Sequence, residues 1–124
     1  MPIINNSASK FRTELKNITA TSSGDNATEL YVVPNNYSAM VELLLISSGN
    51  QSNKKISIQN FHFEDSTYHT MVNALVMDSN SILNILDGSR LNMHQKDKIV
   101  CFTDTSGNFD VTISVEEYFD PVRI

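Results

Sequence analysis

Apolar and polar residues alternate in short runs from residue 28 onward, and this period of two constrains the fold more than any other feature. The segments KISIQ (55–59) and DVTIS (110–114) alternate strictly. Such alternation is typical of strands that are buried on one face. The gaps between the runs are rich in Asn, Asp, Ser and Pro, and all four glycines fall in them: Gly24, Gly49, Gly88 and Gly107. The spacing predicts an all-β fold, an antiparallel β-sandwich of jelly-roll type with about eight strands and an extended N-terminal arm.

The pattern divides the chain into three parts. Residues 1–27 are polar and turn-rich, and we expect them to form the N-terminal arm and a first strand. Residues 28–120 carry the sandwich, and residues 121–124 form a C-terminal tail. Two stretches fit a helix and a strand almost equally: FRTELKNIT (11–19) and YHTMVNALVM (68–77). For both we favour a strand, because the surrounding chain reads as β, and we expect a bulge or register change near Asn60.

Composition excludes several classes of protein. A chain of 124 residues makes one domain, and its nine basic residues are scattered against a net charge of −5. This distribution argues against nucleic acid as a partner. The longest uncharged apolar run, Leu43 to Ile46, is far too short to span a bilayer, so we expect no membrane partner. The start, MPIINNSASK, lacks the charged and apolar regions of a signal peptide, so we expect no signal peptide and synthesis in the cytoplasm.

The stretch ILDGSRLNMHQKDKIV (85–100) places Asp87, His94 and Asp97 close together in sequence. Asp87-Gly88 is a strong turn signal, because both residues tolerate positive φ. Asp97 stands at the entry to the apolar run that begins at Ile99. Their spacing matches no known metal-binding pattern. We therefore interpret these residues as turns between strands, with no catalytic, metal-binding or cofactor-binding role.

The remaining reactive side chains lead to the same interpretation. His62 and His69 flank an acidic turn and could bind zinc if a hairpin brought them together, but we favour a solvated hairpin tip. Adjacent carboxylates such as Glu116 and Glu117 point to opposite faces of a strand, so they cannot cooperate. Cys101 lies in an apolar run and is expected to be a buried structural thiol. The sequence thus predicts that the protein is not an enzyme and needs no cofactor.

The order of the strands resembles a known family. Three segments carry the resemblance: ELYVVPNNYSAMVELLLIS (29–47), SNSILNILDGSRLNM (79–93) and KDKIVCFTDTSGNFDVTISVEEY (96–118). They are similar to small virion proteins of tailed bacteriophages, with their L-Y-x-V-P, L-x-L-L-D-G and D-V-x-V-S elements in this order. The resemblance covers Thr28 to Tyr118. It departs at Lys96, where the family pattern has Gly, so the type of turn at this position is left open.

The resemblance implies a non-enzymatic β-sandwich in a phage particle, with other copies of itself and other virion proteins as partners. It implies a capsid-decoration role on the capsid surface or, alternatively, a tail- or fibre-associated adaptor, and localisation in the virion after synthesis in the host cytoplasm. A different class of protein, a soluble carbohydrate- or receptor-binding sandwich, is less well supported. Such modules usually stack aromatic rings on sugars, and this chain has no Trp.

Strict alternation also predicts an apolar second face. It would place Met40, Leu44 and Ile46 outward on one strand and Phe102 outward on another. Either these residues contact another copy in a homo-oligomer, or the N-terminal segment covers them within the fold. The arms add further candidate contacts with neighbouring subunits: Ile3, Ile4, Phe11, Val122 and Ile124.

Overall fold

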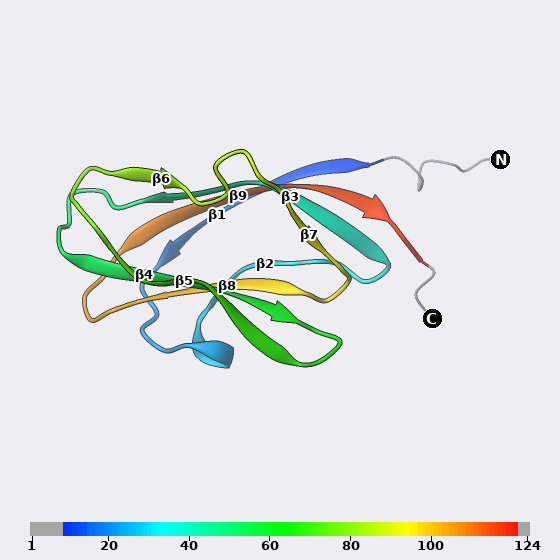
Figure 1. The fold of residues 1–124 in the computed structure, drawn as a ribbon, viewed down its shortest axis with the longest axis horizontal. Helices are drawn as coiled ribbons and strands as arrows, with labels where there is room; N and C mark the ends of the chain where they lie inside the picture. Colours follow the sequence, from blue (N-terminus) through cyan, green and yellow to red (C-terminus); the bar gives the residue numbers. More distant parts are fainter. Residues whose placement is uncertain (1–8, 122–124) are drawn as a thin grey trace.

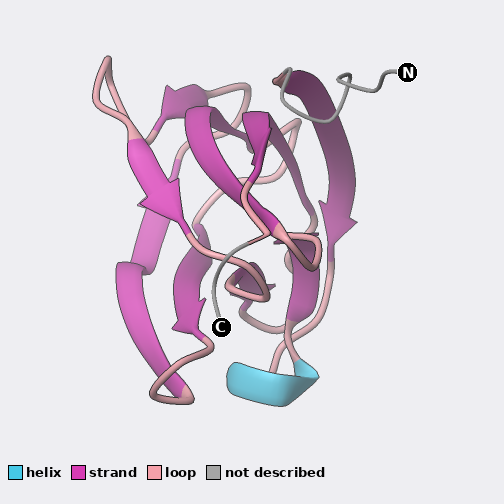
Figure 2. Ribbon diagram, turned by 90° about the vertical axis from the view of Figure 1, so that its right-hand side faces the viewer, coloured by secondary structure: helices cyan, strands magenta, loops and turns pink. Residues whose placement is uncertain are grey.

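The computed structural model describes residues 9–121, and nearly all of its regular structure is β. The nine strands are β1 (Lys10–Ile18), β2 (Thr28–Val32), β3 (Tyr37–Ser47), β4 (Lys54–His62), β5 (Thr67–Met77), β6 (Ile82–Asn84), β7 (Leu91–Met93), β8 (Lys98–Thr103) and β9 (Phe109–Phe119). A single 3-10 turn, η2 (Gly24–Asn26), lies at one end of the molecule (Figure 2). No helix within residues 9–121 is long and apolar enough to cross a membrane.

The strands form two antiparallel sheets that lie one above the other (Figure 1). The first, sheet A, has the order β1-β9-β3-β6, and β7 also pairs with β3. The second, sheet B, has the order β2-β8-β4-β5. The expected antiparallel sandwich is therefore confirmed. Both ambiguous stretches are strands, since they form β1 and β5.

The core lies between the sheets and follows the alternation of the sequence. On β9 the odd-numbered positions from Phe109 to Val115 are buried, while Thr112 and Ser114 are partly exposed on the outer face. Facing side chains come from β8, where Ile99 and Cys101 have no exposed surface. Burial of this kind contributes about 25 cal/mol per Å² of apolar surface, and it is the main force that holds the two sheets together.

A bulge in β3 overturns one prediction from the sequence. The pairing of β3 with β9 shifts between Val41 and Leu43, so Glu42 is the extra, exposed residue. After this bulge the side chains change face. Leu44 and Ile46 therefore point into the core and have no exposed surface, while Met40, before the bulge, stays partly exposed on the outer face. The prediction of an outward position was wrong for Leu44 and Ile46 but held for Met40, because strict alternation does not continue across a bulge.

The segment between β1 and β2 covers part of the outer face of sheet B. The Gly24 amide donates to Oε1 of Gln59 over 3.1 Å, and the Thr103 amide donates to the Ala20 carbonyl over 2.8 Å. Gln59 lies directly opposite Val100, which is 1% exposed. A segment N-terminal to β2 thus lies next to this part of β8, as one of the two alternatives drawn from the sequence proposed. Phe102, two residues further along, is partly exposed on the same face.

The register change expected near Asn60 lies on the partner strand. Strand β4 pairs with β8 in unbroken register from Ile56 to Phe61. Its pairing with β5 shifts on either side of Ile58, and Ala74 in β5 has a φ of 52°. The extra residues thus belong to β5. Phe61 keeps the outer position of its own strand, where its ring lies 4.7 Å from that of Tyr68.

Candidate interaction surface

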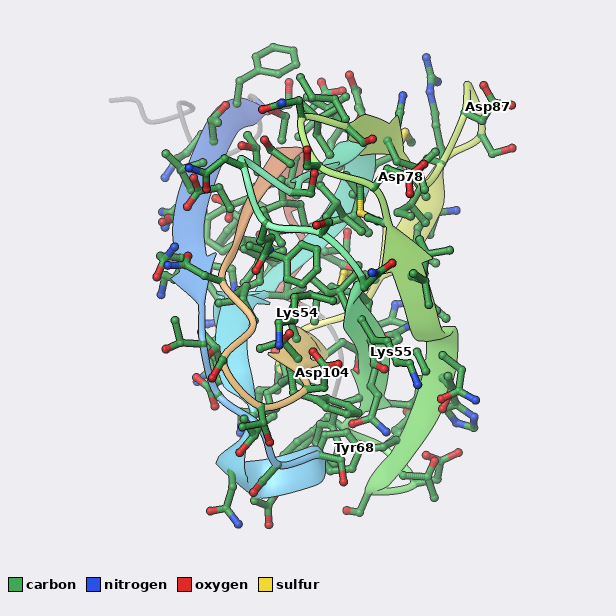
Figure 3. The ribbon with its side chains drawn as sticks, turned by 90° about the vertical axis from the view of Figure 1, so that its left-hand side faces the viewer. Lys54, Lys55, Tyr68, Asp78, Asp87 and Asp104 are labelled. Atoms are coloured by element: carbon green, nitrogen blue, oxygen red, sulfur yellow. The ribbon has the colours of Figure 1, made fainter. Side chains whose placement is uncertain are left out.

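The polar stretch at 85–100 forms two turns. The first is closed by the Ser89 amide, which donates to the Leu86 carbonyl over 2.9 Å, and its central residues Asp87 and Gly88 have φ values of 46° and 88°. Two consecutive positive φ values are the signature of a type I′ turn, for which Asp-Gly is a preferred pair. Figure 3 shows Asp87 at the tip of a loop that extends away from the two sheets. The interpretation of this residue as a turn residue is consistent with that position.

The second turn is organised by a buried carboxylate. Asp97 is 4% exposed, and its two oxygens accept backbone N–H groups from His94 over 3.0 Å and from Phe63 over 2.9 Å. The first bond closes the turn before β8, and the second fixes the end of β4. Lys96 has a φ of 68°, a left-handed conformation that Gly adopts without strain. The turn type that the sequence left open at this position therefore has a left-handed residue at Lys96.

The histidine turn forms a chain of polar contacts on the surface. Nδ1 of His62 lies 3.2 Å from Oδ1 of Asp65, which accepts the Thr67 hydroxyl over 2.6 Å. The same hydroxyl lies 2.9 Å from Nε2 of His69. Bonding to Thr67 and then to His62 lowers the pKa of the Asp65 carboxyl. Within residues 9–121 no three His, Cys, Asp or Glu side chains are grouped as metal ligands would be.

One buried polar cluster was not predicted from the sequence. Glu117 on β9 is 2% exposed and accepts the hydroxyl of Tyr31 on β2. Nε of Arg12 on β1 lies 3.4 Å from the same Glu117 oxygen. Burial, followed by the bond to Glu117, raises the pKa of Tyr31. The prediction that Glu116 and Glu117 face opposite sides of the strand is confirmed. Nothing local in the sequence, however, identifies the partners of Glu117.

This cluster borders an open edge of the sandwich. Three inward side chains of β1, those of Arg12, Glu14 and Lys16, are charged, and together with β2 they line a groove of about 130 Å³. The residues that line it are Arg12, Glu14, Lys16, Glu29, Leu30, Tyr31 and Val32. The groove therefore lies between the two sheets along the charged part of β1, whereas Ile18 at the end of the strand is fully buried in the core.

The outer face of sheet A is apolar over much of its width. In register across the sheet, Leu15 lies beside Thr112 and then Leu45, and Thr13 lies beside Ser114 and then Leu43. These two rows contain no charged residue. We call the apolar side chains of this face the outer patch, and its members are Phe11, Leu15, Met40, Leu43, Leu45 and Ile82.

The patch includes the most exposed large apolar residues of the described chain. Phe11 is 75% exposed, Ile82 67% and Leu15 65%. Contiguous exposed apolar surface commonly marks a site of protein contact. Of the residues predicted as contacts, Phe11 and Met40 lie in this patch and Phe102 lies on the other sheet. Ile3, Ile4, Val122 and Ile124 fall outside the described residues.

The fold and these contacts define the class of protein as an all-β, two-sheet antiparallel sandwich whose buried polar groups brace turns and strand ends. No protein-family model matches the chain, and no curated protein matches it. Among solved structures it is similar to a subunit of the Bacillus endospore appendages, described as disulfide-linked pili. That pair is 11% identical, covers 97% of both chains and has a TM-score of 0.48.

A second likeness is to infectious bursal disease virus VP2. The subviral particle of VP2 gives 10% identity and a TM-score of 0.48, and the Gx strain of the virus gives 9% and 0.46. Nearly all of this chain is covered in both cases, but it spans only 38% of either viral chain. Likenesses at this level define neither a family nor a function.

Proposed function

We propose that the chain is a structural subunit of a virus particle, a small sandwich of the tailed-phage type that binds neighbouring copies of itself and other particle proteins. The observation that carries the proposal is the outer patch of sheet A. Phe11, Leu15 and Ile82 expose apolar side chains, an arrangement suited to burial against another protein. Leu15 lies in an uncharged row beside Thr112, whereas Phe11 lies beside Glu116. A location on the capsid surface, rather than in the tail, belongs to the proposal and is favoured only by the small size of the chain, 124 residues.

The acidic side chains that are candidates for catalysis from the sequence alone are instead hydrogen-bonded within the fold. Both oxygens of Asp97 bind backbone amides, and Glu117 binds Tyr31 and Arg12. These contacts support a role based on shape and surface rather than on chemistry. In a particle, many weak contacts between identical subunits add through multivalency, so no single contact has to be strong.

The proposal is tested by the mass of the purified protein in solution, measured by light scattering over a wide range of concentration. We expect the mass to rise above 13.9 kDa with concentration. Leu45→Lys should weaken this association, because it places a charge in the middle of the outer patch. The matched control is Val76→Lys, which changes a 51% exposed residue of β5 in the other sheet.

Two results would contradict the proposal. One is a monomer at every concentration together with no binding to particle proteins expressed beside it. The other is an equal loss of association in the Leu45 and Val76 variants, since this would show that the patch is not the surface in contact.

A further inference from the structure

Strand β1 is the one long and regular edge among the described strands, and it carries charged side chains on one face. Its nine residues pair with β9 in unbroken register, and its other side pairs with no described strand. Edges of sheets recruit further strands unless they are shortened, bulged, covered or made repulsive by charged side chains. The other edges here are blunted: β6 and β7 have three residues each, β2 has five and a register shift, and β5 is shifted twice.

We propose that β1 pairs antiparallel with β1 of a second copy about a two-fold axis at Thr13, which joins two A sheets into one continuous sheet. The inference rests on the proposed function and adds an edge contact between copies to the contact through the outer patch. A two-fold contact is self-complementary, so each residue meets the residue equally far on the other side of the axis. In this register Phe11 faces the partner's Leu15, and Arg12 faces the partner's Glu14.

The apolar side of the strand fits this register. Directly opposite residues of antiparallel strands lie on the same face, about 4.5–5.5 Å apart. Phe11 and Leu15, 75% and 65% exposed in the single chain, would cover one another twice in the pair. A register centred on Glu14 would instead place Phe11 opposite Asn17 and leave both apolar side chains without an apolar partner.

The charged side fits as well. Inward-pointing charges normally discourage an edge from pairing, and β1 carries Arg12 and Glu14 on this side. In the Thr13 register they form two Arg–Glu pairs across the axis, whereas the Glu14 register brings two glutamates face to face and sets Arg12 against Lys16. Arg12 is already oriented by Glu117 and by its own Glu14, at 3.4 and 3.6 Å.

One like-charge pair remains, Lys10 with the partner's Lys16 at the two ends of the ladder. The Lys10 ammonium lies 5.0 Å from the centre of the Tyr37 ring, so it is directed toward its own β3. A register centred on Leu15 avoids this pair and forms Glu14–Lys16 pairs. It leaves Phe11 opposite Thr19, beyond the end of the strand, and so covers less apolar surface. The experiment below separates these two registers.

The test is disulfide trapping. In Thr13→Cys, two thiols would meet on the axis at the Cα separation of a disulfide, about 4.4–6.8 Å. Thr13 is exposed, and its hydroxyl contacts only the exposed Ser114 hydroxyl at 3.0 Å, so the variant should fold. Under glutathione redox buffer we expect covalent dimer to form at least tenfold faster than in Leu15→Cys. In the Thr13 register, position 15 lies about 14 Å from its copy.

The outcomes are distinct. Faster trapping at position 15 would overturn the Thr13 register, and no trapping at either position would overturn edge pairing. The wild type controls for Cys101, which is buried. If the wild type still associates while neither variant is trapped, the edge inference fails and the proposed function stands. If the wild type is a monomer throughout, the proposed self-association fails as well.

A charge variant gives an independent readout. Glu14→Arg sets arginine against the partner's Arg12 on both sides of the axis, and we expect the dissociation constant of the dimer to rise roughly tenfold or more. Glu64→Arg, the same change at an exposed residue of the β4–β5 turn, should leave it unchanged. Equal effects of both variants would contradict the pairing, because they would reflect net charge alone.

Discussion

The carboxylate of Asp97 offers the sharpest test of how the turns are built. Replacing it with Asn keeps the size of the side chain and one acceptor oxygen, but turns the other acceptor into an N–H donor. In the structure both oxygens accept backbone N–H groups, from His94 and Phe63, and the side chain is 4% exposed. One of these amides would therefore face another donor in a site with almost no water.

The expected magnitude follows from the bonds lost. A hydrogen bond to a charged group contributes about 1.5–3 kcal/mol, and a buried amide left without a partner costs about 1–3 kcal/mol. We expect Asp97→Asn to lower the free energy of unfolding by roughly 2–3 kcal/mol, and Asp97→Ala, which leaves two amides unpaired, by roughly 3–5 kcal/mol.

Urea unfolding followed by circular dichroism measures both variants. With an m value of about 1–2 kcal/mol/M, the midpoint for Asp97→Asn should fall by about 1–3 M. The matched control is Asp87→Asn, the same change at an exposed turn residue whose positive φ Asn also tolerates, and it should shift the midpoint little. If Asp97→Asn lies within about 0.5 kcal/mol of wild type, the bracing role of this carboxylate is refuted.

Three further outcomes follow from other buried groups. Tyr31→Phe should lower the free energy of unfolding by about 1.5–3 kcal/mol, because Glu117 loses a hydrogen-bond donor, and calorimetry at neutral pH measures this. Gly107→Ala should destabilise strongly, since a Cβ there would lie 1.8 Å from Oγ1 of Thr103, and its melting temperature checks this. Burial raises the pKa of Cys101 to about 12, so a thiol reagent should label it only after unfolding.

Two comparisons make these outcomes decisive. Gly88→Ala has open space around the new Cβ and only the strain of a positive φ, so it should lower the free energy of unfolding less than Gly107→Ala does.

The pKa values of Tyr31 and Cys101 are both raised by burial, so these groups lose their protons first in the unfolded chain as the pH rises. The free energy of unfolding should therefore fall above about pH 9–10. This fall should be smaller in the Tyr31→Phe variant than in the wild type. An equal fall in the free energy of unfolding at alkaline pH in the wild type and in Tyr31→Phe would contradict the raised pKa of Tyr31.

The sequence by itself determined where the strands and turns lie. The alternation of apolar and polar residues predicted strands β4 and β9. Turn residues predicted the turns at Asp87-Gly88 and before Asp97. It did so because the strand period and the backbone preferences of turn residues are local properties. The expectation that adjacent carboxylates face opposite sides held at Glu116 and Glu117 for the same reason.

Only the tertiary structure decided which face of β3 is buried after Glu42. The bulge that turns Leu44 and Ile46 inward exists because β3 must match β9 along its whole length, and that pairing joins residues far apart in the sequence. The burial of Glu117 has the same origin, since its donor Tyr31 lies 86 positions away. Long-range pairing of this kind leaves no periodic trace in either segment, so it became visible only in the folded sandwich.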